Sequence, residues 1–227
     1  MSDEPKPVTS LDDPRAITLL TTEHWSLLSA RTLAYNEALT RGSMFLTFLS
    51  MSFVALALLS QTMAFGDEFL IVTAVVLAFD LVIGLTTYGR INGANVDDLR
   101  AVHGMARIRH GYVEIAPLLD RYFTTPTHDD VASLMSVYGT PGPKSRIGDL
   151  LYGFTTSGGM IGLINSLVGG VLVAVAAILF GVSGEWALWI GVAGGIALLG
   201  IIVVSTFGRV AHDRAGLESV FPASDGS

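Results

Sequence analysis

Two histidines, an arginine and a glutamate recur at intervals of three and four residues in one polar stretch: His103, Arg107, His110 and Glu114. On an α-helix these positions fall within an arc of about 60°. A histidine and a carboxylate four residues apart can ligate one transition metal ion, with Glu23, His24 or the His-Asp-Asp sequence at 128–130 completing its coordination from another helix. The alternative is a hydrogen-bonded polar face without metal, because every amphipathic helix has such a face.

A second candidate is a carboxylate in an apolar stretch. The sequence LAFDLVIG at 77–84 places Asp80 among residues that suit the interior of a bilayer. Exposing it to lipid near mid-bilayer would cost about 2.5–3.5 kcal/mol, so its side chain is expected to face a polar partner or an aqueous path. Asn165, in another apolar run, has the same requirement, and we predict Asn165, Ser50 or Thr73 as partners of Asp80. A pore or relay role and a structural hydrogen bond are both open.

Small residues recur every fourth position in two other apolar runs. They are Gly158, Gly162, Ser166, Gly170 and Ala174 in one run and Ala187, Gly191 and Gly195 in the other. Such edges let two helices approach closely and pack by van der Waals contact. One edge could instead pack against a neighbouring subunit or line a narrow pore.

Composition identifies the setting of these residues. Of the 227 residues, 51% are hydrophobic and 15% are charged, and the mean hydropathy is +0.57, whereas soluble domains have about 25% charged residues. Cysteine is absent, which excludes disulfides, thiolate catalysis and cysteine-based metal sites. The net charge of −7 and the scattered basic residues argue against nucleic acid as a partner. No catalytic residues are predicted, and no cofactor other than a transition metal at the histidine face.

Four apolar runs are each long enough to cross a bilayer as a helix. They cover approximately residues 44–65, 69–88, 159–181 and 186–207. All thirteen lysines and arginines lie before the first run, between the second and third, or after the fourth. The excess of basic residues in cytoplasmic segments therefore predicts that both termini and the central loop are cytoplasmic and that both hairpin tips lie outside.

The cytoplasmic segments are predicted to be helical. A stripe at three- and four-residue spacing, from Leu20 through His24 and Arg31 to Ala38, predicts a helix starting near Thr21, with Gly42 as a hinge. A second helix is predicted over 96–123, broken near Pro117, and a third over 128–138, capped by Thr127. The predicted organisation is a disordered tail (1–20), an amphipathic helix (21–42), transmembrane hairpin 1 (43–89), a cytoplasmic helical segment and linker (90–157), transmembrane hairpin 2 (158–208) and a cytoplasmic tail (209–227).

The strings TTEHWSLLSARTLAYNEALTRGSMFL, GMARIRHGYVEIAPLLDRYF and THDD resemble a family of uncharacterised bacterial four-span integral membrane proteins, over roughly residues 20–140. The resemblance implies a multi-pass protein of the bacterial cell membrane and no particular reaction. It also implies an apolar residue at position 80, so that Asp80 departs from the pattern.

These observations predict an all-α membrane protein with four transmembrane helices in two hairpins and a cytoplasmic helical layer. Four spans enclose little polar interior, so we expect a homo-oligomer in the lipid bilayer with a channel-like path on its symmetry axis, gated or assembled by the cytoplasmic helices. The alternatives are a scaffold or accessory subunit and, third, a metal-binding sensor or enzyme at the cytoplasmic face.

Overall fold

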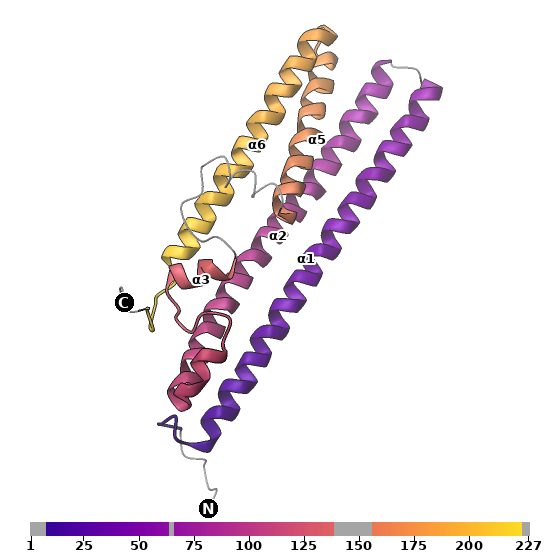
Figure 1. Ribbon diagram of the computed structural model, residues 1–227. Helices are drawn as coiled ribbons and strands as arrows, with labels where there is room; N and C mark the ends of the chain where they lie inside the picture. Colours follow the sequence, from indigo (N-terminus) through magenta and orange to yellow (C-terminus); the bar gives the residue numbers. More distant parts are fainter. Residues whose placement is uncertain (1–7, 64–65, 139–155, 224–227) are drawn as a thin grey trace, which may run out of the picture. The chain divides into compact units, whose positions relative to one another are not determined.

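The structure is a computed structural model that describes residues 8–63, 66–138 and 156–223. Over these residues it contains helices and no strands (Figure 1). The elements are α1 (Pro14–Met63), α2 (Asp67–Ile115), the 3-10 helix η1 (Pro117–Tyr122), α3 (Val131–Val137), α5 (Ser157–Leu179) and α6 (Gly184–Ala215). Four helices are long and apolar enough to cross a membrane, namely α1, α2, α5 and the Gly184–Thr206 part of α6. The predicted all-α class and the four candidate spans are therefore confirmed.

Helix α1 is continuous over 50 residues, which corrects the prediction of two helices with a hinge at Gly42. It starts at Pro14, where the missing proline N–H is harmless, and the backbone carbonyl of Asp13 accepts the Ala16 N–H at 2.8 Å. The predicted start near Thr21 is too late, since residues 14–20 are already helical. Gly42 is buried, and a Cβ there would meet only Ile91 Cδ1 at 3.8 Å. It permits close packing without breaking the helix.

Helix α2 is also longer than predicted. It runs from Asp67 to Ile115 without a break between the second apolar run and the polar stretch around His103. It ends just before Pro117, which lacks the N–H that a helix interior needs, and η1 follows at once. The predicted break near Pro117 is thus confirmed, whereas the separate helix over 96–123 is wrong.

The short helix α3 starts later than predicted. Asp130, not Thr127, is its N-cap, because the Asp130 carboxylate accepts the Ser133 N–H at 3.0 Å. Residues 128–130 are extended instead of helical. Gly139, which the sequence predicts as the stop of this helix, lies outside the described residues.

Helices α5 and α6 are joined by a tight turn. Thr156 caps α5 by accepting the Gly159 N–H at 3.1 Å. Gly181, with φ of +85°, adopts the left-handed conformation that terminates helices and that glycine adopts without a Cβ clash. Helix α6 then continues to Ala215, beyond the predicted end near Phe207.

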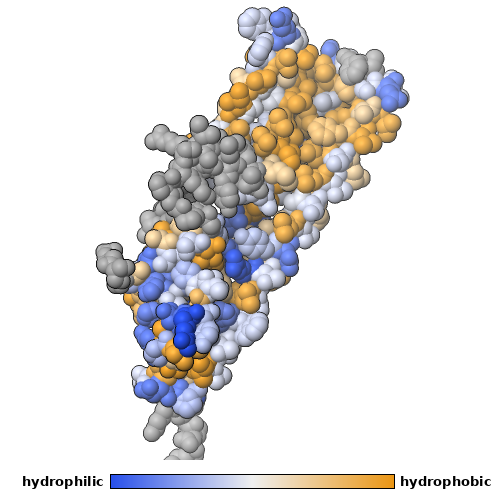
Figure 2. All heavy atoms as spheres, in the orientation of Figure 1, coloured by the Kyte–Doolittle hydropathy of each residue, from blue (hydrophilic) through white to orange (hydrophobic). Residues whose placement is uncertain are grey.

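The chain forms two compact units. Unit 1 comprises Met1–Ala34, Asn95–Pro143 and His212–Ser227, and unit 2 comprises Tyr35–Ala94 and Lys144–Ala211. The core of unit 1 consists of Ala101, Val102, Met105 and Ala106 of α2 with Leu134 of α3, and Leu27 and Leu217 pack against it. Its visible surface mixes charged and apolar residues (Figure 2).

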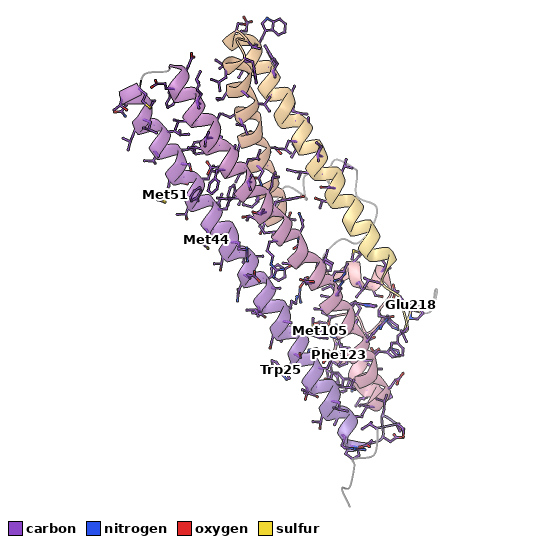
Figure 3. All side chains as sticks on the ribbon, turned by 180° about the vertical axis from the view of Figure 1, so that it is seen from behind. Trp25, Met44, Met51, Met105, Phe123 and Glu218 are labelled. Atoms are coloured by element: carbon purple, nitrogen blue, oxygen red, sulfur yellow. The ribbon has the colours of Figure 1, made fainter. Side chains whose placement is uncertain are left out.

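In unit 2, α1 and α2 run side by side (Figures 1 and 3). Their buried positions recur every three or four residues: Ala38, Gly42, Phe45, Leu49, Ser52 and Leu56 on α1, and Thr73, Leu77, Asp80, Gly84, Thr87 and Ile91 on α2. This spacing is typical of helices packed along a continuous seam. The visible face of unit 2 is largely hydrophobic (Figure 2).

Candidate functional site

The carboxylate of Asp80 lies inside unit 2 with no exposed surface. Ser52 Oγ, on the facing side of α1, donates a hydrogen bond to Asp80 Oδ1 at 3.0 Å. The second oxygen, Oδ2, accepts no hydrogen bond from the described residues. Among the described residues, a single hydroxyl is therefore the only donor to a fully buried acid.

The observed donor to Asp80 is Ser52, which is not among the predicted partners. The Ser50 hydroxyl donates to the Leu46 carbonyl of its own helix at 2.8 Å and is exposed. Thr73 is buried two turns from Asp80, and its Oγ1 has no hydrogen-bond partner among the described residues. The prediction of Ser50 is wrong because Ser50 and Ser52, two residues apart, point to opposite sides of α1.

Asn165 of α5 is also fully buried, and it lies against α2. A Cβ added to Gly84 would be 1.8 Å from Asn165 Oδ1 and 2.8 Å from Phe45 Cζ. Gly84 follows Asp80 by four residues and therefore lies on the same face of α2, one turn along. Neither Oδ1 nor Nδ2 of Asn165 has a hydrogen-bond partner among the described residues. The amide thus fits into space that any other residue at position 84 would fill.

The small-residue edges bring α5 and α6 into backbone contact. A Cβ on Gly170 would be 2.9 Å from the Gly191 carbonyl oxygen, and one on Gly195 would be 2.9 Å from the Ser166 carbonyl oxygen. Gly162 differs from these, because its neighbours are Tyr88 of α2 and Ile202 of α6. Gly158, at the start of α5, is buried. The small-residue edge of α5 therefore packs against two helices, α2 and α6.

In unit 1, the polar face of α2 meets the segment before α3. Arg107 Nε donates to Asp129 Oδ2 at 2.7 Å, and His103 Nε2 lies 3.4 Å from the same oxygen. Asp129 also accepts hydrogen bonds from three residues near the C-terminus: Ser219 Oγ at 2.6 Å, Val220 N at 2.9 Å and Phe221 N at 2.8 Å. The part of the polar face around His103 and Arg107 is thus packed against Asp129, whereas Glu114 stays exposed.

Asp129 is ionised in this environment. Burial by itself would raise the pKa of the carboxyl group, but the hydrogen bonds from Ser219, Val220, Arg107 and Phe221 lower the pKa well below its usual range. The pKa of His103 is lowered, mainly by burial and then by the charge of Arg107, against the opposing effect of Asp129. An anion facing a cation and a neutral imidazole therefore forms the centre of this cluster.

The residues of the metal hypothesis are brought together only in part: His110 lies beside Glu114 and, with ring centroids 6.0 Å apart, beside His128. His110 Nε2 lies 3.4 Å from Glu114 Oε1, as their spacing predicts, but the His110 ring stacks on Phe221 with centroids 4.2 Å apart. His24 lies beside Tyr112, at 6.4 Å between ring centroids, and burial lowers its pKa, with a smaller effect of Arg109. Glu23 is exposed. The part of the chain that the structure describes contains no group of three or more histidines and acids placed to hold a metal ion.

A second buried acid of unit 1 has no counterpart in the sequence predictions. Asp98 of α2, 1% exposed, accepts hydrogen bonds from the Arg31 guanidinium of α1 and from the Tyr138 hydroxyl at 2.7 Å. This cluster joins α1, α2 and the end of α3. The sequence gives a partial indication of this pair, because Arg31 occurs in the apolar stripe of α1, and an arginine that is half-buried there favours an acidic partner.

Comparison with known proteins does not extend these findings: no family model matches the chain, and no curated protein or solved structure matches it either. The family resemblance of residues 20–140 therefore stays a prediction.

Proposed function

We propose that the protein is a multi-pass membrane permeation protein in which Asp80 forms an intramembrane site for a proton or a small cation. The observation that carries this proposal is the burial of Asp80, with Ser52 as its one hydrogen-bond donor among the described residues. An ionised carboxylate in apolar surroundings is costly unless its charge is compensated. A proton or a bound cation supplies that compensation.

The surroundings of Asp80 suit such an ion. The neighbouring polar groups of unit 2 offer oxygen atoms: the Ser52 hydroxyl, and one turn along α2 the Asn165 amide oxygen. Carboxylate, hydroxyl and amide oxygens are the ligands that hard cations prefer. Asp80 and Asn165 are both buried by the helices of their own chain, which favours a path between these helices over one on an oligomer axis.

The proposed arrangement in the membrane has two hairpins, α1 with α2 and α5 with α6, and a cytoplasmic layer formed by unit 1. It is supported by the distribution of the thirteen basic residues, all of which lie outside the two tight turns. Both termini are then cytoplasmic, and the membrane is the bacterial cell membrane implied by the resemblance. Helix α1 would extend well beyond the bilayer, because 50 residues span about 75 Å at 1.5 Å per residue.

A role as a scaffold or homo-oligomer subunit is the second candidate, and the outer face of α1 favours it. Met44 and Met51 project on the side of α1 that faces away from α2 (Figure 3) and are 67% and 65% exposed. With Ser43, Thr47 and Phe48 they line a shallow groove. The two hydroxyls donate to carbonyls of their own helix, so this face can pack against an apolar partner helix.

Flux measurements in liposomes test the permeation proposal. We expect proton or sodium flux through the reconstituted protein to fall to background in Asp80→Asn, because the neutral amide has no charge to compensate. Asp67→Asn, in the exposed first turn of α2, is the matched control and should keep the wild-type flux. Wild-type flux in a folded Asp80→Asn protein would refute the proposal.

A further inference from the structure

The last described residues of the chain, 218–223, form an irregular segment of unit 1 that bends at Val220 and Phe221, here called the C-terminal segment. Figure 3 shows Glu218, its first residue, close to α3. The segment follows the end of α6 at Ala215. Its sequence, ESVFPA, has no helical or strand pattern of its own. Its conformation must therefore be imposed by the surface on which it lies.

The contacts to this segment are mainly to its backbone. Asp129 accepts the N–H groups of Val220 and Phe221, one with each carboxylate oxygen, and the Asp129 N–H donates to the Phe221 carbonyl at 3.2 Å. The Arg107 guanidinium donates to the Glu218 carbonyl, and Asp130 Oδ2 accepts the Ala223 N–H at 3.2 Å. Two consecutive N–H groups at the bend thus donate to one carboxylate. Hydrogen bonds to the main chain can supply affinity for a peptide, and contacts to a few side chains supply selectivity.

Two side chains of the segment make specific contacts. The Ser219 hydroxyl donates to Asp129 Oδ1 at 2.6 Å, and the Phe221 ring stacks on His110 at 4.2 Å with an interplanar angle of 22°. Between them, Val220 contributes its N–H while its residue is 56% exposed. The surface therefore distinguishes a serine and a phenylalanine two residues apart, and leaves the intervening side chain in solvent.

The residues that contact the segment are also held in place by contacts that do not involve it. Asp129 is held by Arg107 of α2, and Asp130 is fixed by capping α3 through Ser133. Leu134 anchors α3 in the core of unit 1. If the segment leaves, these contacts remain, and Asp129 exchanges four hydrogen bonds for water, three of its carboxylate and one of its backbone N–H.

We propose that Asp129, Arg107 and His110 form a peptide-binding site for bent segments with the pattern Ser-x-Phe, and that the C-terminal segment of the same chain is its resident ligand. Exchange of this segment with a neighbouring copy is an outcome that the last experiment below separates. This inference goes beyond the permeation proposal and does not depend on Asp80.

Peptide binding to the full-length protein tests the site. Val220→Pro removes the N–H that Asp129 Oδ2 accepts and is expected to release the segment, whereas Val220→Ala keeps that N–H and is the matched control. The probe is a fluorescent peptide of residues 216–223, followed by anisotropy. A tethered segment competes at an effective concentration of about 1 mM. For a peptide that binds with a Kd of about 10 μM, the Val220→Pro protein should therefore bind about 100-fold more tightly than wild type or Val220→Ala.

Peptide variants show whether binding uses the proposed contacts. Replacing phenylalanine or serine of the probe by alanine should weaken binding to Val220→Pro at least tenfold, and Asp129→Asn in that background should abolish it. Release of the segment is measured separately, by its proteolysis. A released segment without peptide binding would overturn the proposal, as would a Val220→Pro segment that stays as protected as the wild-type one, or equal binding of all probe variants.

Mixing two defective copies identifies the source of the ligand. A Val220→Pro copy has an empty site, and an Asp129→Asn copy has an intact segment without a site of its own. If segments exchange between copies, differently tagged versions of these two should associate more strongly with each other than Val220→Pro does with itself. Equal association assigns the ligand to the same chain.

Discussion

The contact between Gly84 and Asn165 gives a sharp prediction for the packing of unit 2. A Cβ at position 84 would be 1.8 Å from Asn165 Oδ1, and ordinary contact begins at 3.4 Å, so α2 and the amide must separate by about 1.6 Å. Phe45 Cζ, 2.8 Å from the same point, blocks movement toward α1. Overpacking of this kind typically costs 1–3 kcal/mol, and we expect Gly84→Ala to lower the free energy of unfolding by about 3 kcal/mol.

Gly89→Ala is the control for this substitution. It lies on the same helix, and an added Cβ there meets nothing within 4 Å. Alanine favours a helix over glycine by up to about 1 kcal/mol, so Gly89→Ala should be neutral or stabilising. The two variants are compared by unfolding in mixed detergent micelles with increasing SDS, or by their Tm.

The same contact predicts a rescue. Asn165→Ala removes the amide that a Cβ at position 84 would strike, so the double variant with Gly84→Ala should regain at least about 1 kcal/mol of the loss. Asn165→Ala alone should cost little, because the amide has no hydrogen-bond partner among the described residues to lose. Equal stability of Gly84→Ala and Gly89→Ala, or a double variant as unstable as Gly84→Ala, would refute this account of the packing.

Three further predictions concern both units. Asp98→Ala leaves the Arg31 guanidinium without its buried acceptor and should lower the free energy of unfolding by about 3 kcal/mol in denaturant titrations. Arg41→Gln, which removes an exposed ion pair, should leave the midpoint of the denaturant titration unchanged. Burial lowers the pKa of His24 and of His103. As the pH falls below 6.5, these histidines are protonated in the unfolded chain before they are protonated in the folded protein, so the free energy of unfolding should be constant above pH 6.5 and decrease toward pH 5. In His24→Leu this decrease should be smaller. Gly191→Ala, whose Cβ would lie 2.7 Å from the Gly170 carbonyl oxygen, should lower the Tm, whereas Gly200→Ala, in open space, should not.

Local patterns in the sequence predicted the features of the fold that depend on local chemistry. The apolar runs indicated the four candidate spans, and the stripe from Leu20 to Ala38 marks positions of α1 that are buried or half-buried. Pro117 ends α2 because its ring and missing N–H act on the adjacent turn. None of these features requires knowledge of a distant contact.

The continuity of α1 and α2 could not be predicted in the same way. A glycine such as Gly42 lowers helix propensity by only about 1 kcal/mol, and packing against α2 decides whether the helix continues. The choice of Ser52 over Ser50 likewise requires knowing which side of α1 faces Asp80. The site residues were thus recognisable as polar groups in apolar runs, but their partners were not.

The contacts of Asp129 with the C-terminal segment could not be predicted from any sequence pattern. Ser219, Val220 and Phe221 are about 90 residues further along the chain, and the segment that contains them looks like an unstructured tail. The range 209–227 is predicted as a cytoplasmic tail; in the structure α6 continues to Ala215, and backbone groups of residues 218–223 are hydrogen-bonded to unit 1. The His-Asp-Asp sequence at 128–130 is predicted as a source of metal ligands, whereas Asp129 and Asp130 accept backbone hydrogen bonds.

Helices α1 and α2 are joined by ion pairs in some segments and by an apolar seam in others. In unit 1 the facing positions of α1 and α2 include the ion pair of Arg31 with Asp98, whose ends can be hydrated when the helices separate. In unit 2 the ion pair of Glu37 with Arg90 likewise joins the two helices, whereas within the candidate spans the facing positions are apolar, small or hydroxyl-bearing, as at Phe45, Gly84 and Ser52. An unpaired charge in lipid is costly. Among the described residues of unit 2, Asp80 is the one buried acid. An acid that has only one hydroxyl donor among the described residues is the position in unit 2 where the proposed proton or cation would contribute most to stability.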